Sequence, residues 1–306
     1  MFLAGSSLSR GLDHTGTIPV GNGEYRKKHG PDHIDCLVGA IKGEGYSQAS
    51  LNYIDSIRPL DIASFSGLNT LRLLGGRWVR DYNRNSPTFG KPILVFKDEK
   101  GNPLRPLALP SGPHEKKTIP HVIQTYDSSE ARFAALIYGS NNRDFFDKNK
   151  FSVEEALKMF FEEITILFDG SDFEAVFIST IFPRGEDFDM KRLRVTSSVQ
   201  EFNELLTAQK TRCSMDFQLK IKNRKGETRD LKWMPVDMTQ ELVYTEIQRM
   251  RPDQKYFCEK NLDKIRKGKK ADYTHINAVY LEKFYRKLDV CVDNFIRNQR
   301  RRGKKS

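Results

Sequence analysis

Residues 131–139 read ARFAALIYG, residues 152–168 read SVEEALKMFFEEITILF and residues 175–181 read AVFISTI. The middle segment begins with a capping box, since Ser152 precedes the apolar residues and Glu155 follows three positions later. Its apolar residues then recur at helical spacing, which predicts a helix with one buried face. The two flanking runs have the length and composition of buried strands. A strand, a helix and a second strand in this order predict a parallel βαβ unit.

Other segments extend the same pattern in both directions. Apolar runs at 33–38, 60–65 and 233–236 predict further strands, and the residues at 69–82 and 278–298 predict helices. Strands that alternate with amphipathic helices are typical of parallel sheets covered by helices. We therefore expect an α/β fold with a mostly parallel central sheet in a three-layer α/β/α sandwich.

Three regions are expected along the chain. Residues 1–30 are rich in Gly, Ser and charge without periodicity and predict a flexible N-terminal arm. Residues 31–298 are predicted to form the α/β domain, interrupted by a Pro- and Gly-rich insertion with one hairpin at 83–125. Residues 299–306 are predicted to be a basic C-terminal tail.

The bulk composition excludes several classes of protein. The 306 residues are 38% hydrophobic and 30% charged, which suits a globular α/β domain with ample core. No apolar run approaches the ~18 residues that cross a bilayer, and the first residues are too short a run for a secretory signal. The four Cys residues are scattered, which favours free thiols. We expect no membrane span and an intracellular location, cytoplasmic or nuclear.

Four loops lie where active sites of parallel sheets form, after strands or before the last helix. They start at Gly39 and Ser64, and the other two read GSNN (139–142) and DYTH (272–275). In this order they resemble the sequence blocks of the SGNH (GDSL-type) hydrolase family. Members of that family carry a strand that runs into Gly-Asp-Ser, often with Gly four residues later. A strand ending near Gly, a Gly-x-Asn-Asp loop and Asp-x-x-His follow.

The resemblance implies a role for each matching residue and an SGNH- or flavodoxin-like sheet. It implies that His275 is the general base and that Asp272 orients it. It further implies that Gly67 and Asn141 belong to the second and third blocks, with Asn141 in the oxyanion hole.

The first block departs from the family pattern at the nucleophile. With 33–38 as the first strand, Ala40 and Ile41 stand where the family has Asp and Ser. A hydrocarbon side chain cannot attack a carbonyl carbon. Asn142 also replaces the Asp of the third block. The sequence therefore predicts a pseudo-hydrolase whose remaining site residues are vestigial, and the neighbouring hydroxyls are better explained as structural. They are Ser47, Ser64 and Ser66.

The end of the chain carries most of the net charge. From residue 245 to residue 306 there are 18 Lys and Arg against 8 Asp and Glu, which gives +10 of the total +11. Clustered cations beside aromatic side chains are typical of contacts to phosphates and bases, although a solvated basic face has the same composition. The predicted nucleic-acid contacts are Lys264, Arg266, Lys267, Lys269, Lys270, Arg300, Arg301 and Arg302.

These observations together predict a nucleic-acid-binding module, with RNA favoured, on an SGNH-like frame without its nucleophile. One alternative is an esterase that uses a non-standard nucleophile or a water activated by His275. A second alternative is a protein-interaction scaffold that uses 83–125 as its contact surface. The sequence holds no Walker-type loop, zinc-ligand spacing or dinucleotide fingerprint, so no cofactor and no metal are expected.

Overall fold

The computed structural model describes residues 1–6, 17–21, 24–27, 61–65, 67–109, 114–127, 132–147, 149–183, 188–189, 194–195, 197–211, 218–239 and 278–303. Several predictions lie outside these residues and stay predictions. They are the strand at 33–38, the lysine and arginine cluster at 264–270, and the Asp272 and His275 pair.

A six-stranded sheet in the order β11-β12-β8-β7-β1-β4 forms the centre of the described part of the chain. β11 (Leu219–Lys222) pairs antiparallel with β12 at one edge, and every other pairing is parallel. This confirms the predicted α/β class with a mostly parallel sheet. The parallel strands are β1 (Phe2–Ser6), β4 (Asp61–Phe65), β7 (Phe133–Ile137), β8 (Ala175–Ser179) and β12 (Thr228–Val236).

Strand β1 corrects the prediction of a flexible arm at the start of the chain. Phe2–Ser6 pairs with β4 on one side and with β7 on the other. Phe2, Leu3 and Ala4 are completely buried. The predicted arm is therefore wrong for residues 2–6. A run of five residues shows no measurable periodicity, so its burial between two other strands is invisible in the sequence.

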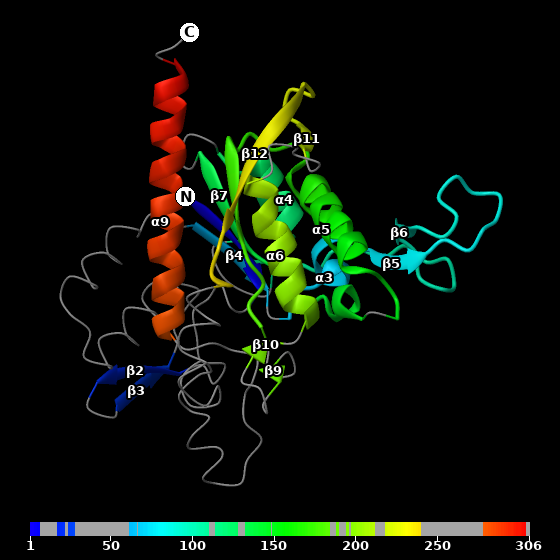
Figure 1. Cartoon of the computed structure of the whole chain (residues 1–306), viewed down its shortest axis with the longest axis horizontal. Helices are drawn as coiled ribbons and strands as arrows, with labels where there is room; N and C mark the ends of the chain where they lie inside the picture. The colour runs from blue at the N-terminus through cyan, green and yellow to red at the C-terminus, as the bar shows by residue number, and fades with distance from the viewer. Residues whose placement is uncertain are drawn as a thin grey trace.

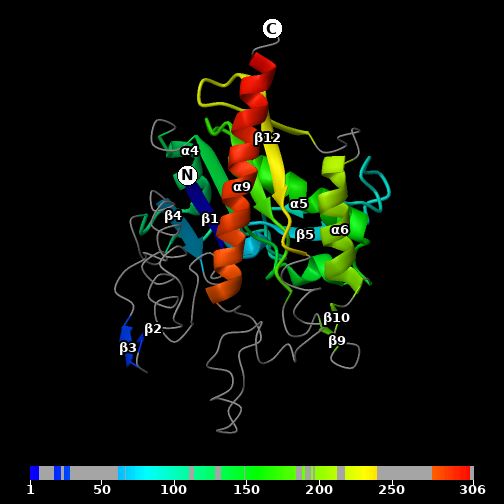
Figure 2. The same cartoon turned by 60° about the vertical axis from the view of Figure 1, so that its left-hand side comes forward.

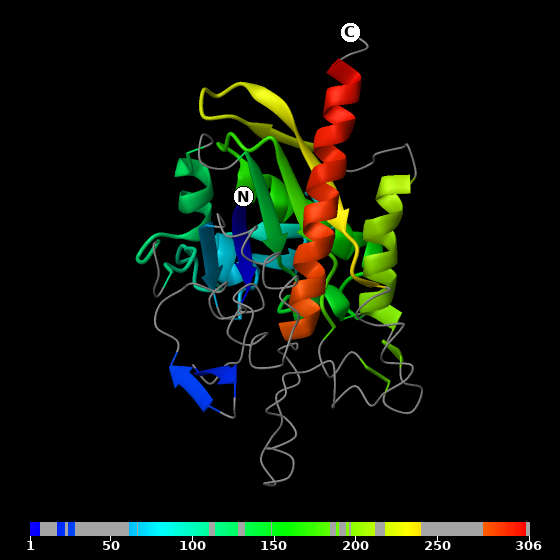
Figure 3. The same ribbon diagram turned by 90° about the vertical axis from the view of Figure 1, so that its left-hand side faces the viewer.

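Helices pack against both faces of the sheet (Figures 1 and 3). α5 (Val153–Phe168) and α6 (Ser197–Thr211) lie on one face, and α9 (Ala278–Gly303) lies on the other. The predicted capping box of α5 is confirmed. The Glu155 amide donates to Ser152 Oγ at 3.2 Å, and the Ser152 amide donates to the Glu155 carboxylate at 2.9 Å.

Helix α9 runs antiparallel to the parallel strands. Early in the helix, the Phe284 ring lies 6.1 Å from that of Phe182, which follows the end of β8. Later, the Phe295 ring lies 5.7 Å from that of Phe133, the first residue of β7. The helix therefore begins at the carboxyl edge of the sheet and ends beyond its amino edge (Figure 2). Because α9 extends to Gly303, the predicted tail at 299–306 is helical through that residue.

The helix predicted at 69–82 is only partly correct. α3 (Thr70–Leu74) ends at Gly75, whose φ of 68° is a left-handed cap, and β5 (Arg77–Arg80) follows. A Cβ on Gly75 would lie 2.4 Å from a backbone atom of Arg105, so this position requires glycine. The predicted helix therefore ends at Gly75 rather than at residue 82.

The shorter elements complete the described chain. β5 pairs with β6 (Pro92–Val95) in a hairpin. β6 and α4 (Ile119–Thr125) lie within the predicted insertion at 83–125, and β5 precedes it. The hairpin predicted within the insertion is present around residues 98–102, since Lys97 bridges to Pro103. The remaining elements are β2 (Thr17–Gly21), β3 (Glu24–Lys27), η2 (Arg143–Phe146), β9 (Phe188–Asp189) and β10 (Arg194–Val195).

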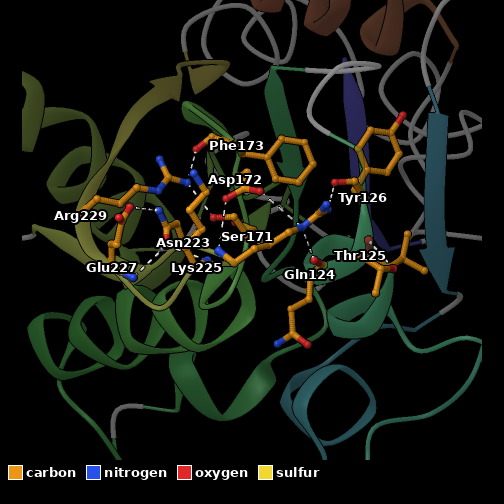
Figure 4. A network of polar contacts seen from close by, with 12 residues as sticks. Gln124, Thr125, Tyr126, Ser171, Asp172, Phe173, Asn223, Lys225, Glu227 and Arg229 are labelled. Carbon is orange, nitrogen blue, oxygen red and sulfur yellow. Dashed lines mark hydrogen bonds and ion pairs between the residues drawn. The ribbon is translucent and has the colours of Figure 1, made fainter.

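An arginine network connects the segments at the amino edge of the sheet (Figure 4). Arg224, in the turn between β11 and β12, and Arg229, in β12, donate to backbone carbonyl oxygens of the segments that precede β7 and β8. Asp172 also pairs with Arg224, at 3.5 Å. This network fixes the edge opposite the carboxyl ends of the strands. The carbonyl acceptors are those of Gln124, Tyr126, Ser171 and Phe173.

Candidate functional site at the carboxyl edge of the sheet

The connections of the sheet place a topological switch point at β1. β1 is flanked by β4, the next parallel strand along the chain, and by β7, the one after it. The chain therefore leaves β1 in one direction and later returns on its other side. Ligands of open α/β sheets bind at such a switch point, outside the carboxyl ends of the strands.

Gly5 brings the end of β1 unusually close to β7. Its register partners are Ser64 in β4 and Ile137 in β7. A Cβ at this position would lie 2.4 Å from the Ile137 carbonyl oxygen, so no larger residue fits. Ser6 ends the strand, and the next residue of the sequence is Ser7.

This strand changes the assignment of the first sequence block. Gly5, Ser6 and Ser7 follow the family order Gly-Asp-Ser with Ser6 in place of Asp, and Gly11 stands four residues after Ser7. The proposed loss of the nucleophile assumed that 33–38 is the first strand of the sheet. Because β1 pairs with both β4 and β7, the strand between those two is Phe2–Ser6. The strand predicted at 33–38 and the block at Ala40 and Ile41 lie outside the described residues and stay predictions. Ser7 lies outside the described residues.

The loop after β7 forms a tight turn that carries Asn141. Gly139 has a φ of 104°, and a Cβ there would approach the Ile181 side chain to 2.9 Å. The Asn142 amide donates to the Gly139 carbonyl oxygen at 2.9 Å. Asn141 is half-buried and Asn142 is buried. Of the two, Asn141 is thus the residue with solvent exposure.

The loop after β4 meets this turn directly. Gly67 follows the strand with a φ of 65°, and Asn69 then caps α3 by accepting from the Arg72 amide at 3.1 Å. The amide of Thr70 donates to Asn142 Oδ1 at 3.1 Å. The predicted second and third blocks are therefore neighbours in space.

The predicted Asp272 and His275 precede α9. Their own positions are outside the described residues. However, α9 begins at Ala278, three residues after His275, and this end of the helix lies at the carboxyl edge. Lys287 supports this placement, because its Nζ donates at 2.7 Å to the carbonyl oxygen of Asp237, which follows the end of β12.

A buried carboxylate beneath these loops was missed in the sequence. Glu163 of α5 is 0% exposed. Its Oε1 accepts from Thr70 Oγ1 and from Trp78 Nε1, both at 2.6 Å. Its Oε2 accepts from Tyr138 Oη at 2.6 Å and from Asn142 Nδ2 at 3.4 Å. All four donors are neutral.

Burial of Glu163 changes the titration of this group. Desolvation raises its pKa from the ordinary 4.5 to about 7, although the hydrogen bonds from its neighbours oppose the rise. Burial likewise raises the pKa of Tyr138 well above its ordinary value, and the charge of Glu163 adds to the effect. A charged residue on the apolar stripe of α5, between Phe160 and Leu167, is the sequence signal that identifies Glu163.

The predicted nucleic-acid contacts Arg300 and Arg301 lie away from this site. Arg300 and Arg301 are exposed in the last turns of α9, which end beyond the amino edge of the sheet. At 1.5 Å per helical residue they are about 33 Å from the start of the helix. They therefore do not border the carboxyl edge of the sheet. A pocket beside them is lined by Lys232, Trp233, Phe295, Asn298 and Gln299, among others.

The predicted insertion exposes apolar side chains. Phe89, Phe96 and Leu107 are 50%, 45% and 47% exposed. Arg80 anchors the hairpin to α5 through two hydrogen bonds of 3.0 Å to the Glu155 carboxylate. A role of this segment in binding a protein partner stays a prediction.

Within the described ranges, His, Cys, Asp and Glu side chains form no group of three suited to a metal ion. Nor does any helix of those ranges have the length and hydropathy needed to cross a bilayer. Comparison with protein-family models, with curated proteins and with solved structures finds no significant match for this chain.

Proposed function

We propose that the chain carries an SGNH-like serine hydrolase site at the carboxyl end of β1, within a three-layer α/β/α sandwich. Ser7 is the nucleophile, His275 the general base and Asp272 its orienting partner, and Asn141 donates to the oxyanion. The substrate class is a carboxylic ester or a related acyl compound.

One observation carries this proposal. The end of β1 lies beside the end of β7, with Gly5 opposite Ile137, so a serine at the end of β1 and the loop of Asn141 follow adjacent strand ends. The start of α9 at the same edge supports the role of the residues just before it.

The chemistry follows from these roles. His275 takes the proton of the Ser7 hydroxyl as its oxygen attacks the acyl carbon, and Asn141 stabilises the negative charge on the carbonyl oxygen. His275 then protonates the leaving alcohol, and water releases the acyl group by the same steps. Two departures from the family pattern, Ser6 and Asn142, affect neither the nucleophile nor the base.

The test is covalent labelling with a fluorophosphonate, followed by identification of the modified residue by mass spectrometry. We expect labelling of Ser7, turnover of short-chain p-nitrophenyl esters, and loss of both in the Ser7→Ala and His275→Ala variants. Ser6→Ala is the matched control, because it alters the adjacent hydroxyl, and it retains labelling. Absence of labelling and of turnover over a panel of esters would contradict the proposal, as would labelling that survives Ser7→Ala.

Nucleic-acid binding is a second candidate function, favoured by the end of α9. Arg297, Arg300 and Arg301 are exposed there, beside the pocket that Trp233 and Asn298 help to line. Exposed cations beside a surface pocket suit the phosphates of single-stranded RNA. Fluorescence anisotropy with a labelled single-stranded RNA should show affinity that falls steeply with salt, and it should fall when Arg300, Arg301 and Arg302 are replaced by Gln. Binding that is undetectable or independent of salt would remove this candidate.

A further inference from the structure

The carboxylate of Glu163 is bonded to the loops after β4 and β7, which border the candidate site, and to the hairpin strand β5. Thr70 belongs to α3, which follows β4, and Trp78 belongs to β5 of the hairpin. Tyr138 and Asn142 belong to the loop after β7. The carboxylate itself comes from α5, on one face of the sheet. One buried side chain therefore connects three segments that are far apart in the sequence.

Asn142 completes this connection. Its Oδ1 accepts from the Thr70 amide at 3.1 Å, and its Nδ2 donates to Tyr138 Oη at 2.9 Å. Nδ2 also lies 3.2 Å from Thr70 Oγ1 and 3.4 Å from the Glu163 carboxylate. The Asn142 amide therefore connects the loop after β4, through Thr70, with Tyr138 and Glu163.

The cluster explains why residue 142 is an asparagine and not an aspartate. A carboxylate in place of Asn142 would put a second negative charge within hydrogen-bonding distance of Glu163 in a site without solvent. It would also supply no donor to Glu163. The departure from the Gly-x-Asn-Asp pattern is therefore explained by the buried Glu163.

We infer that Glu163 is a positioning residue, which holds the loop of Asn141 against the end of β1 through Asn142, Thr70 and Tyr138. It touches no substrate. This inference rests on the proposed function for its catalytic meaning, whereas the positioning of the loops is measurable without it.

The first experiment reads the cluster directly. Trp78 and Trp233 are the two tryptophans of the chain, so two indole N–H signals are expected in a ¹H–¹⁵N NMR spectrum, and Trp78→Phe assigns them. The groups that face Glu163 are Thr70, Trp78, Tyr138 and Asn142, and of these four Tyr138 alone titrates, at far higher pH. The Trp78 signal should therefore shift with one inflection as Glu163 titrates near neutral pH, and the Trp233 signal should not.

In Glu163→Gln the Trp78 inflection should disappear. Hydrogen exchange at the Thr70 and Asn142 amides should also accelerate, because their loops lose the shared acceptor. A Trp78 signal with the same titration in Glu163→Gln and in the unmodified chain would overturn the inference, whether or not the chain hydrolyses esters. Tyr138→Phe removes one donor only, so it tests the same loops if Glu163→Gln does not fold.

The second experiment connects the cluster to the reaction. The rate of fluorophosphonate labelling should fall by about 100-fold in Glu163→Gln and in Asn142→Asp, since a displacement of about 1 Å in a catalytic group has this effect. The double variant exchanges the amide and the carboxylate and should label faster than either single variant. Labelling of both single variants at the unmodified rate would overturn the inference and leave the proposed function intact. No labelling of the unmodified chain would contradict the proposed function, and the NMR result would still decide the role of Glu163.

Discussion

The two edges of the sheet are held together by opposite kinds of polar network. At the amino edge, Arg224 and Arg229 donate to backbone carbonyl oxygens, and the side chain of Arg224 is 35% exposed. At the carboxyl edge, the fully buried carboxylate of Glu163 accepts from four neutral donors. Water can replace part of the first network but has no access to the second.

This difference separates a structural edge from a candidate functional one. A solvated arginine on turn carbonyls stabilises the fold at small electrostatic cost. Burial of a carboxylate without a neighbouring cation lowers the stability of the folded protein, because the charged form loses its hydration. Such a group is therefore expected where it fixes a functional geometry. The carboxyl edge is where the loops of Gly67 and Asn141 meet.

The largest expected effect is the loss of the buried acceptor. Glu163→Leu keeps the volume and leaves the Trp78, Tyr138 and Thr70 donors without an acceptor. We expect the free energy of unfolding to fall by about 4 kcal/mol. Chemical denaturation followed by circular dichroism measures this change.

The matched control is the neighbouring residue of the same helix. Glu162 is exposed, so Glu162→Leu should change the free energy of unfolding by less than about 0.5 kcal/mol. Equal effects of the two substitutions would show that the carboxyl edge is not held by Glu163.

A pH dependence of stability is expected next in size. Because burial raises the Glu163 pKa from 4.5 to about 7, the folded chain keeps a proton that the unfolded chain loses between these values. The free energy of unfolding should therefore decrease as the pH rises from 4.5 to 7, by about 3 kcal/mol in all, and the contribution stays constant above that range.

Glu163→Gln isolates this contribution. Asp81, Asp98 and Glu155 have lowered pKa values and titrate with the opposite sign in both proteins, so the difference between the two proteins removes them. Urea denaturation at several pH values gives the difference directly. A difference that does not vary with pH over this window would mean that Glu163 is not a buried acid.

How much the sequence predicts depends on how local the signal is. The unit from β7 to β8 is predicted because two apolar runs and the Ser152 capping box each act within a few residues. β1 is missed because its burial comes from pairing with β4 and β7, which are about 60 and 130 residues away.

The candidate site divides in the same way. Asn141 and Gly67 are predicted from short motifs, and a hydrogen bond from the Thr70 amide to Asn142 connects their loops. Their roles stay predictions. Glu163 is missed because its partners Thr70, Trp78 and Tyr138 come from three other elements. The sequence signal for Glu163 is its position on the apolar face of α5. That position does not show which residues Glu163 contacts.

The smallest effect is expected at the amino edge. Arg224→Ala removes the bonds to the carbonyl oxygens of Gln124 and Tyr126 and the ion pair with Asp172. Because these groups are partly solvated, we expect the free energy of unfolding to fall by about 1 kcal/mol and fluorophosphonate labelling to stay unchanged. A loss as large as that of Glu163→Leu would remove the distinction between the two edges.

The central claim is that Phe2–Ser6 is an inner strand of the sheet and carries the site at its end. Peptide-resolved hydrogen exchange of the intact chain tests it without any ligand. The amides of Leu3 to Ser6 should exchange as slowly as those of β7, because β1 is buried and paired on both sides. Complete exchange of these amides at the earliest time point, as in an unstructured arm, would contradict the account.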